Sequence, residues 1–189
     1  MQPEYIFAIV GGGIALILVI ILLWYITTLN NFRKMRIKID ESISSIDVAL
    51  TKRYDLLTKM LTICKNHAKH EQNALLKIIE LRQPLPMSSI HEKSAFAAQM
   101  VEAMKSLNLI VENDSDLKAN KTFIKLQNAA VEVEENLQAA RRFYNGNVRM
   151  YNRKVIVFPS NLVARHRGFG SEEFFEAEDT SRGDVDENF

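Results

Sequence analysis

The pattern of apolar and polar positions divides the chain into one long apolar run followed by amphipathic segments. Residues 5–32 contain no charged side chain, and residues 6–26 are all aliphatic, aromatic or glycine. A helix of about twenty residues rises about 30 Å, which matches the hydrocarbon core of a bilayer. The sequence therefore predicts that residues 1–32 hold a short external N-terminus and one transmembrane helix.

The charges on either side of this run predict its orientation. Only Glu4 is charged before it, whereas four basic residues follow it closely: Arg33, Lys34, Arg36 and Lys38. Basic residues stay on the cytoplasmic side, so we expect a single-pass membrane protein with its N-terminus outside and its C-terminal domain in the cytoplasm. A cleaved signal peptide is the alternative, but the acidic start and the length of the run favour an uncleaved anchor.

After the apolar run, apolar residues recur at helical spacing. No proline interrupts residues 4–83, and the apolar positions advance in steps of three, four and seven. They are Ile43, Ile46, Leu50, Leu57, Leu61, Cys64, Ala68, Leu75 and Ile79. Such steps form one stripe on a helix. We expect the helix of the span to continue to about Leu81, with basic residues such as Arg53 away from the stripe.

A second amphipathic segment predicts another helix. Pro84 and Pro86 mark a loop, because proline lacks the amide donor and clashes with the preceding helical turn. Ser89 and Glu92 then have the spacing of a capping box, which would begin a helix over residues 89–111. Its apolar stripe is Phe96, Met100, Ala103, Met104, Leu107 and Val111.

A third helix is expected after residues 113–116, Asn-Asp-Ser-Asp, whose side chains favour a turn. The helix would begin at about Asn120 and end by Phe158, because Pro159 disfavours the helical conformation in the residue before it. Its stripe is Phe123, Leu126, Ala130, Val133, Leu137, Ala140, Tyr144, Val148, Tyr151 and Val155.

Long amphipathic helices with short links predict an all-α fold, in which residues 33–170 form an antiparallel long-helix bundle of three to four helices. The first soluble helix is much longer than the second, so the helix ends cannot all be flush. Either a helix bends or the chain after Pro159 folds back to cover the excess length. Residues 171–189 are expected to form an acidic, disordered tail.

The pair Tyr-Asn occurs twice, at Tyr144-Asn145 and at Tyr151-Asn152. Seven residues are about two helical turns, so both pairs project from nearly the same side. Two interpretations remain open. The tyrosines could set the register of the bundle, each hydroxyl bonding to Asn or to a backbone carbonyl on a neighbouring helix, or the pairs could contact a partner. Arg149 and Asn161 complete this set of candidate interaction or registry residues.

The stretch RRFYNGNVRMYNRKVIVFPSNLVA resembles the C-terminal signature of the LemA family. IDVALTKRYDLL, NHAKHE, DLKANKTFIKLQ and FFEAE match further family segments in the same order. The resemblance implies a single-span anchor with a cytoplasmic helical bundle, no established catalytic residue, and an association of one relative with magnetosome membrane formation. This chain departs from the family pattern at Gly146, where glycine costs a helix about 1 kcal/mol relative to alanine.

The sequence offers little support for catalysis. It contains no phosphate-binding glycine loop, no dinucleotide fingerprint and no nucleophile motif in its expected context. We therefore expect a protein that is not an enzyme and has no cofactor. Cys64, His67, His70 and Glu71 have metal-ligand spacing, and a metal-dependent enzyme is the alternative, but no second helix supplies the ligands that would close a coordination shell.

Two opposed charge blocks lie next to each other near the C-terminus. Residues 141–167 hold seven Arg and Lys residues and no acidic one, and residues 171–189 hold eight acidic residues. The basic block could be neutralised by the acidic tail or could bind anionic lipid headgroups, whereas nucleic acid is disfavoured by the near-neutral net charge. We expect a membrane-anchored scaffold with unknown protein partners, or alternatively an anionic-lipid-binding module that shapes membranes.

Overall fold

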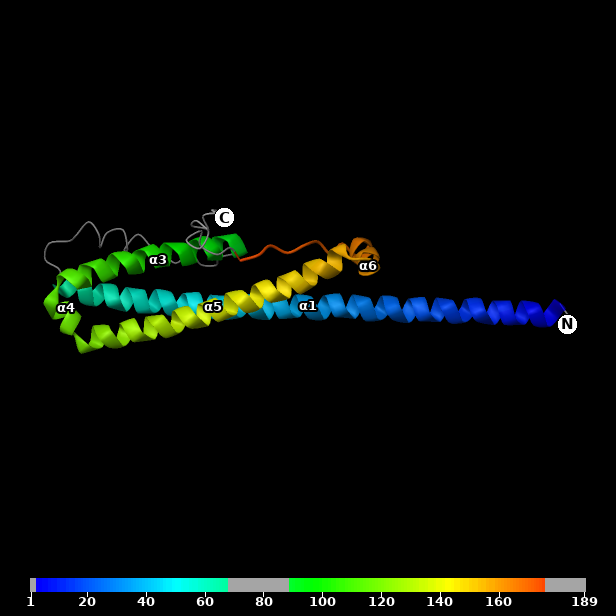
Figure 1. The fold of residues 1–189 in the computed structure, drawn as a ribbon, viewed down its shortest axis with the longest axis horizontal. Helices are drawn as coiled ribbons and strands as arrows, with labels where there is room; N and C mark the ends of the chain where they lie inside the picture. The colour runs from blue at the N-terminus through cyan, green and yellow to red at the C-terminus, as the bar shows by residue number, and fades with distance from the viewer. Residues whose placement is uncertain (1–2, 68–88, 176–189) are drawn as a thin grey trace, which may run out of the picture. The chain divides into compact units, whose positions relative to one another are not determined.

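The computed structural model describes residues 3–67 and 89–175, and side chains within residues 11–65 and 89–175. Over these residues the chain is helical without strands, which confirms the predicted all-α fold. The helices are α1 (Pro3–His67), α3 (Ile90–Asn113), α4 (Ser115–Ala119), α5 (Lys121–Ile156) and α6 (Ser160–Arg167) (Figure 1). The chain divides into two compact units, each described separately below.

Helix α1 runs without a break from the apolar run into the amphipathic segment, as the absence of proline predicts. Where the apolar run ends, the Thr27 hydroxyl donates to the Leu23 carbonyl at 2.8 Å, so this polar group is satisfied within the helix. The predicted continuation to Leu81 is confirmed as far as His67. Its remaining residues and the predicted proline loop lie outside the described residues.

Unit one consists of Met1–Asp40 with Gly146–Glu172. Its core joins the first half of α1 to the end of α5 and to α6. The buried apolar side chains are Leu29, Phe32, Ile39, Val148, Tyr151, Val163 and Ala164. Phe169, which follows α6, stacks on Phe32 with ring centroids 5.0 Å apart and planes at 19°. The chain after Pro159 therefore folds back, which decides between the two solutions that the sequence leaves open.

Helix α6 was not predicted from sequence. Helix α5 ends at Ile156, as expected ahead of Pro159, and the chain then re-enters a helix at Ser160; the Phe158–Pro159 peptide bond is cis. Gly168 ends α6 with a φ of 70°, a conformation that glycine adopts without steric cost. The Phe169 amide donates to the Ala164 carbonyl at 2.9 Å, which closes the turn and directs the chain back along α5.

Unit two consists of Glu41–Asn145 with Glu173–Phe189. The second half of α1, α3, α4 and the first part of α5 bury the predicted stripes against one another. The largest fully buried side chains in this unit are Phe96, Phe123, Ile46, Leu50, Leu57, Met60, Met100, Leu107, Leu117 and Leu137. Figure 1 shows α3 and α5 running along this part of α1, with α4 joining them.

The helix starts of unit two are capped by side chains that the sequence identifies. Ser89 and Glu92 form the predicted capping box, each side chain accepting from the other's amide at 3.1 Å. Residues 113–116, predicted as a turn, instead contain the start of the short helix α4. Asp114 caps it by accepting from the amides of Asp116 and Leu117, and Asn120 caps α5 in the same way. The local capping chemistry was therefore recognisable, but its helical outcome was not.

The position expected for Arg53 away from the buried stripe is wrong. Arg53 is 6% exposed, and its guanidinium lies 2.8 Å from the carboxylate of Glu134 on α5. Lys93 is equally buried and pairs with Asp47. A buried cation is tolerated when an anion and hydrogen-bond acceptors compensate its lost hydration. The helical stripe identifies apolar positions, but not a charge whose partner comes from another helix.

Candidate functional site

Both tyrosines of the repeated pairs are buried, as predicted for stripe residues. Tyr144 is 2% exposed in unit two, and Tyr151 is 1% exposed in unit one. The ring of Tyr151 meets Phe32 edge-on at a centroid distance of 5.8 Å. Burial raises the pKa of Tyr151. The negative charge of Glu172 raises it further, and this effect is larger than the opposing effect of Arg36. The phenol therefore stays protonated at neutral pH.

The partner of Tyr144 differs from the one expected on a neighbouring helix. Its hydroxyl donates to the backbone carbonyl of Glu173 at 2.8 Å. Glu173 belongs to the non-helical segment that follows α6, which Figure 1 shows as an extended trace. The tyrosine thus buries its ring in the core while its hydroxyl holds the returning chain.

Each asparagine of the pairs binds one residue of this segment through two hydrogen bonds. In unit two, the Asn145 amide nitrogen donates to the Phe175 carbonyl at 3.0 Å, and its oxygen accepts from the Phe175 amide at 2.9 Å. In unit one, Asn152 binds Glu172 identically, at 2.8 and 2.9 Å. We call this arrangement a carboxamide clamp. It satisfies backbone groups that lack a helical partner.

The seven-residue spacing of the two asparagines suits the segments that the clamps connect, which are a helix and an extended chain. Seven helical residues rise about 10.5 Å, whereas three residues of extended chain span about 10 Å. Glu172 and Phe175 are three residues apart, so two asparagines seven positions apart on α5 match their spacing. The repeated pair is thus explained by contacts within the chain, which supports the registry interpretation.

The two clamps predict separate effects on amide exchange. Replacing Asn152 with alanine should accelerate hydrogen exchange at the Glu172 amide by about fivefold, because an intramolecular hydrogen bond contributes about 1 kcal/mol. Asn145→Ala should do the same at Phe175 and leave Glu172 unchanged. Each variant is the control for the other in residue-resolved exchange measurements. Equal protection of the two amides from exchange in the unsubstituted chain and in both variants would show that the clamps do not hold this segment.

Other contacts around the clamps were missed from sequence. The Arg141 guanidinium lies 4.7 Å from the centre of the Phe175 ring, which is buried. Asn147 is also buried, and its amide donates to the Lys38 carbonyl at 3.4 Å. The two phenylalanines of FFEAE are the sequence signal for such a contact, because aromatic residues in an acidic segment are expected to pack against an apolar surface elsewhere in the protein.

The remaining candidate residues are not part of a clamp. Arg149 is exposed. Asn161, at the start of α6, is half-buried, and its side-chain oxygen is shielded from solvent without a hydrogen-bond partner in the described part of the chain. In unit two, Tyr144 and Asn145 therefore bind the segment after α6, and in unit one Asn152 does so while Tyr151 is buried in the core.

A surface pocket of unit one gathers three arginines just beyond the apolar run. Its volume is about 460 Å³. It is lined by Leu29, Arg33, Arg36, Ile37, Asp40, Arg167 and Phe169. Arg33 and Arg36 project from α1, and Arg167 comes from the last turn of α6. Three cations against one carboxylate, together with the apolar lining residues, make this a pocket suited to an anion with an apolar portion.

The arginines of this cationic pocket keep their charge available. Over residues 11–65 and 89–175, none of them lies within 4.0 Å of a carboxylate oxygen in an ion pair. In the sequence, Arg33 and Arg36 indicate only the orientation of the span, and Arg167 belongs to the basic block. Their proximity is not visible there, because it requires the fold-back of α6.

The possible metal ligands are only partly described. Burial, with a smaller contribution from Asp114, raises the pKa of Cys64 to about 11, so its thiol is protonated at neutral pH and is a poor metal ligand as it stands. The His67 side chain, His70 and Glu71 lie outside the described side chains. Within those described, no group of three or more His, Cys, Asp or Glu residues is arranged to hold a metal ion.

These features define an all-α protein, and in the described part of the chain one helix is long and apolar enough to cross a membrane. The sequence model of the LemA family matches residues 42–189, so the chain belongs to the LemA family. It is similar to Protein LemA of Metamycoplasma hominis, with 26% identity over 164 residues, covering 86% of this chain and 75% of that protein. The resemblance noted from the sequence is thereby confirmed.

Proposed function

We propose that this protein is a non-enzymatic scaffold, anchored in the bacterial cytoplasmic membrane by α1, whose cytoplasmic helical units bind protein partners. The observation that carries this proposal is the continuous exposed apolar surface of α1. Every large apolar residue from Ile14 to Leu23 is more than half exposed, and Figure 1 shows this blue stretch without a neighbouring helix. A helix that is apolar on all sides needs an apolar surrounding.

The ends of the run support an anchor. Trp24 and Tyr25 stand where it ends, and amphipathic aromatic rings favour the level of the lipid headgroups. The cluster of basic residues that follows supports a cytoplasmic location for the rest of the chain. A long helix that leaves the bilayer and packs directly into the two units would couple them mechanically to the membrane.

The described surface supports binding rather than catalysis. The cationic pocket contains arginines, one aspartate and apolar residues, a set that favours anion binding but lacks an evident nucleophile or paired acid and base. The clamps are used within the chain. A scaffold is therefore the function that the geometry supports best.

Site-specific labelling tests this proposal. Cys64 is the only cysteine, so a Cys64→Ser chain provides an unlabelled background. In that background, Gln2→Cys should react with a membrane-impermeant maleimide in intact cells, whereas Ser181→Cys should react only after lysis. Alkaline carbonate should leave the protein in the membrane fraction. Reaction of Ser181→Cys in intact cells would contradict the cytoplasmic location, and release by carbonate would contradict the anchor.

A further inference from the structure

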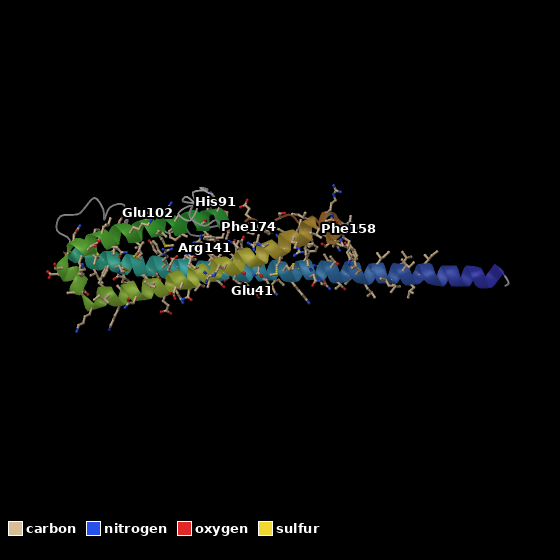
Figure 2. The ribbon with its side chains drawn as sticks, viewed as in Figure 1. Glu41, His91, Glu102, Arg141, Phe158 and Phe174 are labelled. Carbon is tan, nitrogen blue, oxygen red and sulfur yellow. The ribbon has the colours of Figure 1, made fainter. Side chains whose placement is uncertain are left out.

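The turn between α5 and α6 exposes an unusual group of large apolar side chains in unit one. Ile156 is 69% exposed, Val157 49%, Phe158 73% and Leu162 55%. Figure 2 shows Phe158 at this turn. We call these four residues the apolar corner. Clustered exposed apolar residues on a soluble surface are unfavourable, so a surrounding that covers them is expected.

Contacts within unit one show how far along α1 the corner lies. Asn147 on α5 donates to the Lys38 carbonyl, and Tyr151 packs on Phe32. The partner numbers on α1 fall as the numbers on α5 rise, so the two segments are antiparallel. Continuing this register places the end of α5 beside the residues that follow Trp24.

A separate contact made by α6 places the corner at the same position along α1. The His166 ring meets Tyr25 edge-on, with centroids 6.1 Å apart. Tyr25 lies near the C-terminal end of the apolar run. The apolar corner therefore lies at the level where α1 would leave the hydrocarbon core.

Basic residues flank the corner in sequence, and others lie farther along α1. Arg153, Lys154 and Arg165 flank it in sequence, within a stretch that holds no acidic residue. On α1, Arg33 of the cationic pocket comes seven residues after Ile26, which is about 10 Å farther along the helix. The polar layer of each leaflet is about 5–7 Å thick, so the Cα of this arginine lies just outside it, and its long side chain can extend back to the level of the lipid phosphates.

We propose that the apolar corner inserts into the bilayer leaflet from which α1 emerges, while the arginines of the cationic pocket bind phosphates of anionic phospholipids. Apolar tips with basic flanks are the pattern of surfaces that lie in a membrane interface. Unit one would then contact the bilayer at two places, the span and the corner. This inference rests on the proposed function only in requiring that α1 crosses the membrane.

Tryptophan fluorescence of the full chain in proteoliposomes tests the depth of the corner. The protein has a single tryptophan, Trp24, at the end of the apolar run. The fluorescence of the natural chain therefore reports the depth of the anchor. The fluorescence of a Trp24→Phe, Phe158→Trp chain reports the depth of the corner. A Trp24→Phe, Val131→Trp chain is the matched control. Val131 is also an exposed α5 residue, 57% exposed, but belongs to unit two.

Lipids brominated near the start of the acyl chain should reduce the fluorescence of Trp24 and of the tryptophan at position 158, with a blue shift of both, and should leave the tryptophan at position 131 unquenched. Quenching of Trp24 without quenching at 158 would overturn the insertion of the corner and preserve the anchor. Absence of quenching at Trp24 would instead contradict the proposed function. Equal quenching at 131 and 158 would overturn a specific insertion.

Lipid composition tests the role of the arginines. Quenching at position 158 should be stronger in bilayers containing phosphatidylglycerol than in phosphatidylcholine alone. Adding Arg33→Gln, Arg36→Gln and Arg167→Gln to the Trp24→Phe, Phe158→Trp chain should abolish this difference. The same three changes in the natural chain should leave Trp24 quenched. Equal quenching in the two bilayers by the chain with its arginines intact would overturn the binding of anionic phospholipid.

Discussion

Replacing Tyr151 with alanine is expected to destabilise unit one by about 4 kcal/mol, the largest effect of a single substitution that we predict. The ring is almost fully buried and packs edge-on against Phe32. Its removal loses the transfer free energy of an aromatic side chain and leaves a cavity between α1 and α5. The thermal unfolding midpoint of the full chain in mild detergent should fall by many degrees.

Two further variants separate the ring from other contributions. Tyr151→Phe keeps the ring and should cost much less than Tyr151→Ala. Phe143→Ala removes an aromatic residue of the same helix that is 61% exposed, and should change stability by no more than about 0.5 kcal/mol. An unchanged midpoint for Tyr151→Ala would reject the structural role of this tyrosine and favour its contact with a partner.

Replacing Glu134 with leucine is expected to destabilise unit two by about 2 kcal/mol. The Arg53 side chain is 7% exposed, and the substitution removes the carboxylate that lies 2.8 Å from its guanidinium. Removing one member of a buried ion pair costs about 3–5 kcal/mol, and the 32% exposure of the Glu134 side chain reduces this value by admitting water.

The double variant Arg53→Met, Glu134→Leu provides the matched control. It removes both charges and fills the space with apolar atoms, so it should be more stable than Glu134→Leu alone. Denaturant unfolding of the two variants and the unsubstituted chain measures the difference. A double variant that is less stable than Glu134→Leu would show that the contacts of Arg53 other than Glu134 carry its contribution.

The helices of this protein were largely predictable because their information is local. The stripe over residues 43–64 and the spacing of Ser89 and Glu92 specify where apolar faces and helix starts lie. Pro159 likewise ends α5. These features depend on neighbours within a few residues, so they can be recognised without knowing the fold. Residues 113–116 show the limit, since the same capping side chains serve a turn and the short helix α4.

The candidate site was only half predictable for the same reason. The Tyr-Asn repeat and the burial of its tyrosines follow from helical periodicity. The partners of Asn145 and Asn152 do not, because Phe175 and Glu172 lie far along the chain and reach the clamps only after α6 has reversed its direction. Hydrogen-bond partners at such separation are set by topology rather than by spacing.

By itself, the sequence determined an all-α chain with an apolar first helix, its buried stripes and its helix caps, since side-chain size, polarity and period decide these. Only the tertiary structure decided that the chain after Pro159 folds back and that Arg53 is buried against Glu134. It also brought Arg33, Arg36 and Arg167 into one pocket. Each of these outcomes joins residues from different helices, and their energies exist only once those helices are in contact.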